Sequence, residues 1–175
     1  AEEAFRNLSS SVDWRTAYRE TGTKLLDLVL QGKWTTGSVG GEWMMLGLAR
    51  SERLYGGDVE DYIKALESFV KGNINTNGQI KRNGDARPTE NARVALAVSA
   101  LGYDARSFAG YDLLAALKNT AWVTKQGNNA SAFALLAMNA KTAYLAGDEA
   151  LQRAAETLVK SCLLYTSDAA DERSS

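Results

Sequence analysis

The chain has 175 residues, with 20 lysines and arginines against 21 aspartates and glutamates, one cysteine and no histidine. A near-neutral chain gives no electrostatic reason to bind nucleic acid or an anionic membrane surface. Without histidine, Ser-His-Asp and Cys-His catalysis are excluded, and the usual zinc and transition-metal ligands are lacking. No apolar run reaches the ~18 residues that a membrane span requires. We therefore expect no metal, no cofactor, no nucleic-acid partner and no membrane span.

Helical periodicity dominates the sequence and predicts an all-α fold of about seven helices. The first is expected from about Val12 to Leu30, with Gly32 just past its end. A glycine-rich entry precedes the second, where Ser38 is placed to cap a helix that runs to about Ser51.

The third predicted helix has the sequence VEDYIKALESFVKG, with Asp58 as its cap and Gly72 at its end. Its expected apolar face consists of Tyr62, Ala65, Leu66 and Phe69. The fourth opens at Pro88 and Thr89, with Thr89 as N-cap and Gly102 as the residue that follows its end.

Three further helices complete the prediction. A short one covers YDLLAALKN, a longer one covers ASAFALLAMNAKTAYLA after Asn128 or Asn129, and the last, EALQRAAETLVK, starts at Asp148. We expect the last helix to leave an apolar stripe partly uncovered, along with one flank of NASAFALLAMNA; the stripe is formed by Leu151, Ala154, Ala155 and Leu158.

Two kinds of helix alternate along the chain. GGEWMMLGLARS, NARVALAVSALG and NASAFALLAMNA are apolar nearly all round and rich in small residues, whereas the helices between them are amphipathic. A helix that is apolar all round is buried on several sides. Aligning Met44, Val94 and Phe133 gives spacings of about 50 and about 39 residues, in the range of helical-hairpin repeats. We expect an inner layer of apolar helices, with Ala95 and Ala134 at close contacts, inside an outer amphipathic layer.

Three segments carry a resemblance to a known family: SVGGEWMMLGLARS, RPTENARVALAVSALGYDARSFAGYDLLAAL and WVTKQGNNASAFALLAMNA. They resemble the α/α-toroid domains related to terpene cyclases and prenyltransferases, most closely the version in secreted or cell-surface proteins of Gram-positive bacteria. The resemblance covers about Thr23 to Lys160 and implies a partial α/α toroid, an open part of a ring of helical hairpins. It also implies an extracellular or cell-surface location and further domains in the same full-length chain.

Two local motifs resemble functional sites, an acidic proton donor and a calcium loop, but the residues of both favour a structural role. The acidic DxDD proton donor of toroid cyclases is nearest to Asp58-Val59-Glu60-Asp61, which is displaced from that pattern and suits the first turn of a helix. Residues 73–80 resemble the start of a calcium loop, but their side chains are neutral amides. We predict a tight turn at Thr76-Asn77-Gly78 instead, within a short hairpin near 73–83.

The candidate binding residues lie at or near the N-terminal ends of the apolar helices, which in a toroid converge on one mouth of the central cavity. They are Glu42, Trp43, Glu90, Asn91, Arg93, Trp122, Gln126, Asn128 and Asn129. Exposed amides, charges and indoles at such a mouth bind a small ligand or a glycan through hydrogen bonds and stacking. The alternative is structural: Glu90 pairs with Arg93, an asparagine caps a helix, and the two tryptophans pack between layers.

The segment Cys162–Ser175, CLLYTSDAADERSS, resembles a translated sequencing adapter. We therefore expect a truncated domain over 1–161 from a metagenomic fragment and a non-native tail over 162–175. The tail should prolong the last helix by one turn at most and be extended or disordered from Thr166 onward. The rest of the domain is expected in a longer reading frame.

Three functions remain open at this point. The first is a non-enzymatic ligand-binding or scaffolding module of a larger secreted or cell-surface protein, which we favour because the chain lacks catalytic equipment. The second is a terpenoid cyclase-like enzyme whose acidic motif lies in the missing C-terminal half. The third is a purely structural spacer with a filled centre.

Overall fold

A computed structural model describes residues 13–54 and 56–171. Within these residues the fold is all-α, as predicted, with one two-stranded sheet. None of the described helices combines the length and the apolar character needed to cross a bilayer. The α-helices are α2 (Trp14–Leu30), α3 (Met44–Arg50), α4 (Glu60–Asn73), α5 (Pro88–Ala100), α6 (Thr120–Thr124), α7 (Asn128–Met138), α8 (Thr142–Leu145) and α9 (Glu149–Asp171). The shorter turns are the π-helical η1 (Val39–Trp43) and the 3₁₀-helical η2 (Gly56–Val59) and η3 (Ala115–Lys118).

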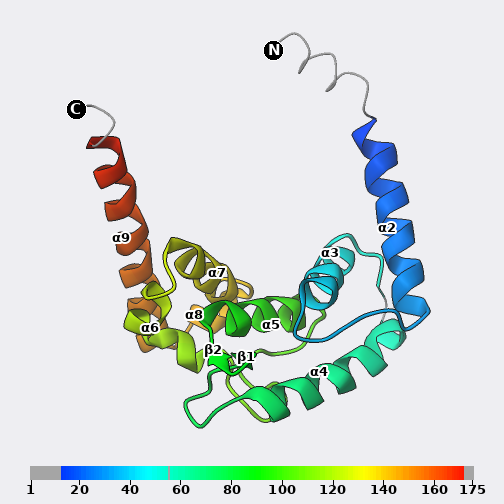
Figure 1. Cartoon of the computed structure of the whole chain (residues 1–175), viewed down its shortest axis with the longest axis horizontal. Coiled ribbons are helices and arrows are strands. Elements are labelled where there is room, and N and C mark those ends of the chain that lie inside the picture. The colour runs from blue at the N-terminus through cyan, green and yellow to red at the C-terminus, as the bar shows by residue number, and fades with distance from the viewer. Residues whose placement is uncertain (1–12, 55, 172–175) are drawn as a thin grey trace.

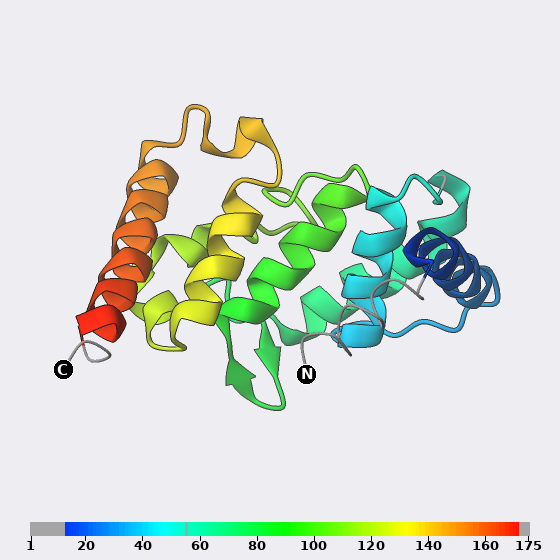
Figure 2. The same ribbon diagram turned by 90° about the horizontal axis from the view of Figure 1, so that it is seen from above.

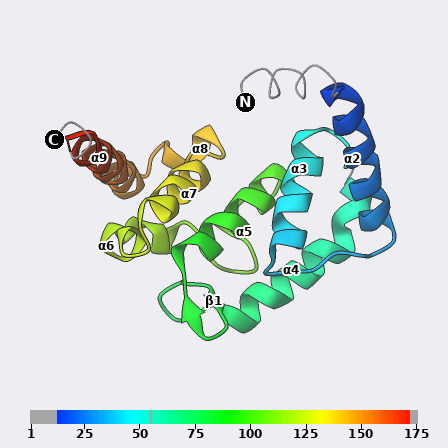
Figure 3. The same ribbon diagram turned by 45° about the horizontal axis from the view of Figure 1, so that its top comes forward.

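The helices form an open arc, with α2 at one end and α9 at the other (Figure 1). In the middle, α3, α5 and α7 lie side by side and run in the same direction (Figures 2 and 3). The central helix α5 contacts α3 and η1 on one side and α7 on the other, and α9 packs against α7. The three helices predicted to be apolar therefore form a continuous row, which α4 passes along one side (Figure 1).

Small residues make this row tight. Ala95 of α5 and Ala134 of α7 are both fully buried, and α5 and α7 make the most extensive helix–helix contact of the described chain. An alanine side chain occupies little space between two helices, so the backbones approach closely and dispersion contacts are dense. The expectation that both alanines lie at packing contacts is confirmed. α7 is not enclosed on all sides, because Leu136 is 56% exposed.

Several predicted caps lie one or two residues from the observed ones. α5 begins at Pro88, with Arg87 rather than Thr89 as N-cap, because proline has no N–H to be capped and its fixed φ suits the first helical position. The N-cap of α4 is Val59, since Asp58 lies in the preceding 3₁₀ turn. The residue before α7 is Gly127, whose φ of +87° disfavours the asparagines predicted for the position.

Two glycines that follow helices and the cap of the last helix were predicted correctly. Gly32 and Gly102 follow α2 and α5 with positive φ, as expected for residues just past a helix. Asp148 caps the last helix, its carboxylate accepting from the N–H of Leu151 at 2.9 Å. Gly72 is an exception, because α4 includes it and ends at Asn73. The buried face of α4 consists of Tyr62, Ile63, Leu66 and Val70, with Ala65 and Phe69 at its half-buried margin.

The predicted hairpin is present. Ile74 and Ile80 form an antiparallel bridge around the expected turn, where the Asn75 side chain accepts from the N–H groups of Asn77 and Gln79. The regular strands follow as β1 (Lys81–Arg82) and β2 (Asp85–Ala86), joined by Asn83-Gly84. Both residues of this turn have positive φ, 53° and 88°, which is the conformation that Asn-Gly prefers in a two-residue hairpin turn.

Two predicted helices were wrong in extent. YDLLAALKN forms only the 3₁₀ turn η3, because Asp112 accepts from the N–H groups of Leu114 and Ala115 and holds a local turn. The long helix after Asn128 is broken into α7 and α8 by a turn at 139–141. The short helix α6, capped by Asn119, was not predicted.

The last helix also differs from expectation. Its stripe is covered: Leu151, Ala154, Ala155 and Leu158 are all buried. The predicted change to extended chain at Thr166 is wrong for 166–171, which belong to α9, while 172–175 lie outside the described residues. A helix that has formed propagates through residues of adequate propensity, and no glycine or proline stops this one. The end of α9 projects away from the other helices (Figure 1).

Candidate functional site

The nine candidate residues separate into a buried group and an exposed group. Glu42, Glu90, Asn91 and Arg93 are all nine-tenths or more buried. Trp43, Trp122 and Asn128 are half-buried, and Gln126 and Asn129 are exposed. The structure therefore does not gather all nine around one mouth.

The buried charges form one network between η1 and α5. Arg93 donates from Nε to Glu42 at 3.0 Å and from the other side of its guanidinium to both oxygens of Glu90, so a single cation bridges two carboxylates. Arg82 adds a longer ion pair to Glu90, at 3.6 Å. The i,i+3 pairing of Glu90 with Arg93 is confirmed, and Glu42 is a third member that sequence spacing did not predict.

Glu42 also closes the glycine-rich loop that precedes it. Its carboxylate accepts from the backbone N–H of Gly37 at 2.8 Å and of Ser38 at 2.9 Å, and from the hydroxyl of Tyr62 at 3.3 Å. Burial, together with the neighbouring Glu42 carboxylate, raises the pKa of Tyr62 well above its usual value, so the hydroxyl stays a donor. The Ser38 side chain makes no capping bond, so the predicted cap is replaced by this reach-back from Glu42.

Asn91 holds two loops together. Its side chain accepts from the N–H of Ile80 at 2.8 Å and donates to the carbonyls of Gly78 at 2.8 Å and Leu113 at 3.1 Å. All of these partners are backbone groups, and the amide is fully buried. Asn91 is therefore committed to the fold rather than available to a ligand.

The remaining candidates at the apolar helices occupy packing or surface positions. The ring centroids of Trp43 and Phe133 lie 5.3 Å apart, with the rings tilted by 48°, so Trp43 packs between η1 and α7, within the row of apolar helices. Asn128 is the first residue of α7 and Asn129 the second, and neither is its N-cap. The acidic string 58–61 spans the end of η2 and the start of α4, where Asp61 pairs with Lys64 at 3.5 Å on the exposed surface.

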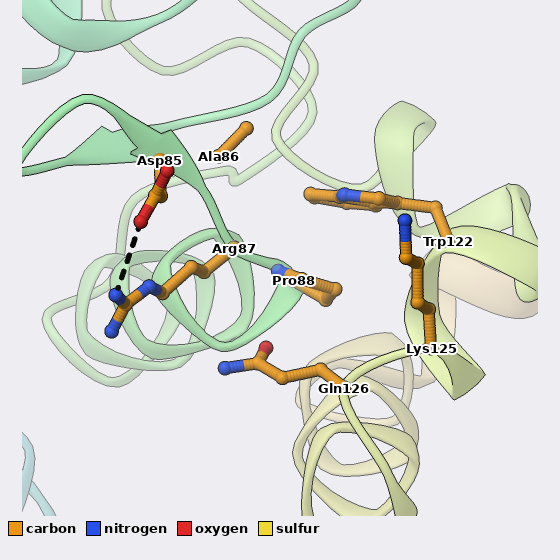
Figure 4. Close-up of a pocket in the computed structure, with 7 residues that line it drawn as sticks. All are labelled: Asp85, Ala86, Arg87, Pro88, Trp122, Lys125 and Gln126. Carbon is orange, nitrogen blue, oxygen red and sulfur yellow. Dashed lines mark hydrogen bonds and ion pairs between the residues drawn. The ribbon is translucent and has the colours of Figure 1, made fainter.

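Trp122 and Gln126 meet at an open pocket of about 440 Å³ between the start of α5 and the end of α6. The strand–helix side contributes Asp85, Ala86, Arg87 and Pro88, and the α6 side contributes Trp122, Lys125 and Gln126 (Figure 4). Gln126 ties the two sides together, since its side-chain oxygen accepts from the Thr89 N–H at 3.4 Å and the Thr89 hydroxyl at 3.3 Å.

The pocket combines an aromatic surface with mixed charge. Arg87 pairs with Asp85 at 3.5 Å in an exposed position. Lys125 is exposed, and within the described chain no ion pair or hydrogen bond engages its ammonium group. The lining therefore has two cations and one carboxylate beside the Trp122 indole. Its volume lies in the range of small-molecule sites, about 300–1,000 Å³.

Sequence reasoning missed five of the seven lining residues. Pro88 was taken only as a helix start, and Asp85, Arg87 and Lys125 showed no motif. The Asn-Gly turn at 83–84 was a usable signal, because it predicts that β2 runs directly into α5 and places Asp85 and Arg87 at the start of that helix. The meeting of this segment with α6 has no short-range signature.

Among the described residues, no three or more acidic or cysteine side chains are grouped closely enough to hold a metal ion. No protein-family model matches the chain, and no curated protein or solved structure matches it.

Proposed function

We propose that this chain is part of a non-enzymatic ligand-binding module, and that its binding site is the pocket between α5 and α6. The observation that carries the proposal is the convergence of Trp122, Lys125 and Gln126 with Arg87 and Asp85 around an open, ligand-sized space. A half-buried indole offers a flat apolar surface, while the amide and charges around it fix orientation through hydrogen bonds.

The buried charges support binding rather than catalysis. Glu42 and Glu90 are the most enclosed carboxylates, and both are engaged by Arg93. Proton transfer requires a carboxyl group within reach of a substrate, whereas these groups serve to join η1 to α5. The chemistry exposed at the pocket is that of recognition: stacking, donors, acceptors and charge.

The wider setting follows from the resemblance. A row of like-oriented helices in an open arc supports assignment to an α/α toroid of the kind found in secreted or cell-surface bacterial proteins. In such a protein this domain would display the pocket alongside other domains of the same chain.

A titration with small sugars, followed by ¹H–¹⁵N correlation spectra, tests the function. The four tryptophans give four indole N–H signals, and a Trp122→Phe variant assigns the one of interest. Binding in the pocket should shift the Trp122 signal and leave that of Trp14, 62% exposed on α2 at the other end of the arc, unmoved. Mono- and disaccharides of glucose, galactose, N-acetylglucosamine and galacturonic acid are the probes. If none of them shifts the Trp122 signal selectively, the proposal fails.

A further inference from the structure

The charge of the pocket indicates what kind of ligand it takes. The lining contains Arg87 and Lys125 but only one carboxylate, Asp85, which leaves it with one excess positive charge. A cleft lined by an excess of one sign attracts ligands of the other.

The two cations are not equivalent. Arg87 is paired with Asp85, and together they present a donor and an acceptor on the β2–α5 side of the pocket. Lys125 lies beside Trp122 on the α6 side of the pocket (Figure 4). Its ammonium has no ion-pair partner among the described residues. An unpaired ammonium beside an indole is the feature that a neutral ligand would leave unused.

We propose that the ligand is a uronic-acid sugar, which rests on the binding function proposed above. The less polar face of the sugar ring lies on the Trp122 indole, and its carboxylate contacts Lys125. The ring hydroxyls donate to Asp85 and accept from Arg87 and Gln126. A carboxylate placed at Lys125 forms an ion pair with the only cation of the pocket that the described structure leaves unpaired.

The expected preference is modest because the ion pair is exposed to water. An exposed pair of this kind corresponds to roughly a two- to fivefold gain in affinity. The gain should shrink as NaCl is raised from about 0.05 to 0.5 M, since screening shortens the range of the interaction. A neutral sugar of the same linkage should show little dependence on salt.

The test compares digalacturonate with its neutral counterpart, a galactose disaccharide of the same linkage, by titration of the Trp122 indole signal. Digalacturonate should bind roughly two- to fivefold more tightly. Lys125→Met keeps the aliphatic stem and should abolish both the difference in affinity between the two disaccharides and its dependence on salt. Lys24→Met, an exposed lysine on α2, is the matched control and should change neither affinity.

The outcomes separate the two proposals. Equal affinities of the two disaccharides for the unaltered chain would overturn the uronate assignment and leave the binding function standing. A shift produced equally by acetate alone would also overturn it, because the site would then recognise an anion without a sugar. If neither disaccharide moves the Trp122 signal, the uronate assignment falls, and the binding function falls with it only if the glucose and N-acetylglucosamine probes also fail.

Discussion

Replacement of Arg93 by methionine should be strongly destabilising. Arg93 is only 5% exposed, and its guanidinium bridges Glu42 and Glu90. Methionine fills much of the space of the side-chain stem but leaves both carboxylates without their main cation. Removing one partner of a buried ion pair costs about 3–5 kcal/mol, because the remaining charge stays desolvated.

The two carboxylates should not suffer equally. Without Arg93, Glu42 keeps the N–H groups of Gly37 and Ser38 and the hydroxyl of Tyr62. Glu90 keeps only the ion pair with Arg82, at 3.6 Å. Most of the cost therefore falls on Glu90, and adding Glu90→Leu to Arg93→Met should restore at least about 1 kcal/mol, because the stranded charge is removed.

Urea unfolding followed by circular dichroism measures the effect. For a chain of this length, about 3–5 kcal/mol corresponds to a fall in Tm of roughly 6–20 °C. Arg153→Met is the control, because Arg153 forms an i,i+4 pair with Glu149 at 3.2 Å while 68% exposed, and its loss should cost no more than about 1 kcal/mol. A loss below about 1 kcal/mol for Arg93→Met, or no recovery in the double variant, would refute the buried network.

Three other changes test the packing, the tail and the pH dependence. Ala134→Leu should overpack the buried face of α7 and cost roughly 1–3 kcal/mol in urea unfolding, whereas Ala132→Leu on the exposed face of the same helix should be nearly neutral. Deletion of 162–175 should change the free energy of unfolding by no more than about 0.5 kcal/mol, and a loss of several kcal/mol would show that the segment belongs to the fold. The hydrogen bond and ion pair from Lys118, at 2.7 Å, hold the pKa of Asp148 below its usual value. A lowered pKa stabilises the fold above the ordinary carboxyl pKa of about 4, and this contribution is lost as pH falls through the folded value. Asp148→Asn should therefore lower Tm more at pH 7 than in acid, and a loss of Tm that does not shrink as the pH is lowered would contradict the assignment.

The burial of the central helices could be predicted from the sequence because it depends on the composition of each helix alone. The runs of alanine, valine and leucine in α5 and α7 specify buried helices wherever they pack, so the burial of Ala95 and Ala134 could be read from the sequence. The helix ends at Gly32 and Gly102 could be predicted equally well, since the ability to adopt a positive φ is a property of glycine itself.

The candidate site was harder to predict because the residues that contact one another there are far apart in the sequence. Glu42 and Arg93 are 51 residues apart, and Thr89 and Gln126 are 37 apart. Periodicity finds only the i,i+3 pair of Glu90 with Arg93, and it cannot detect a five-residue helix such as α6. The pocket is created where two short, irregular segments meet, and neither carries a pattern of its own.

The position of Asn91 has a consequence for how the molecule opens. One amide ties the hairpin, through Gly78 and Ile80, to the segment around Leu113, and it does so from the second turn of the central helix. Neither loop can detach without leaving a buried polar atom of Asn91 unpaired. The two loops therefore act as one cooperative unit, whose amide hydrogens should exchange with solvent together and with protection close to that of α5.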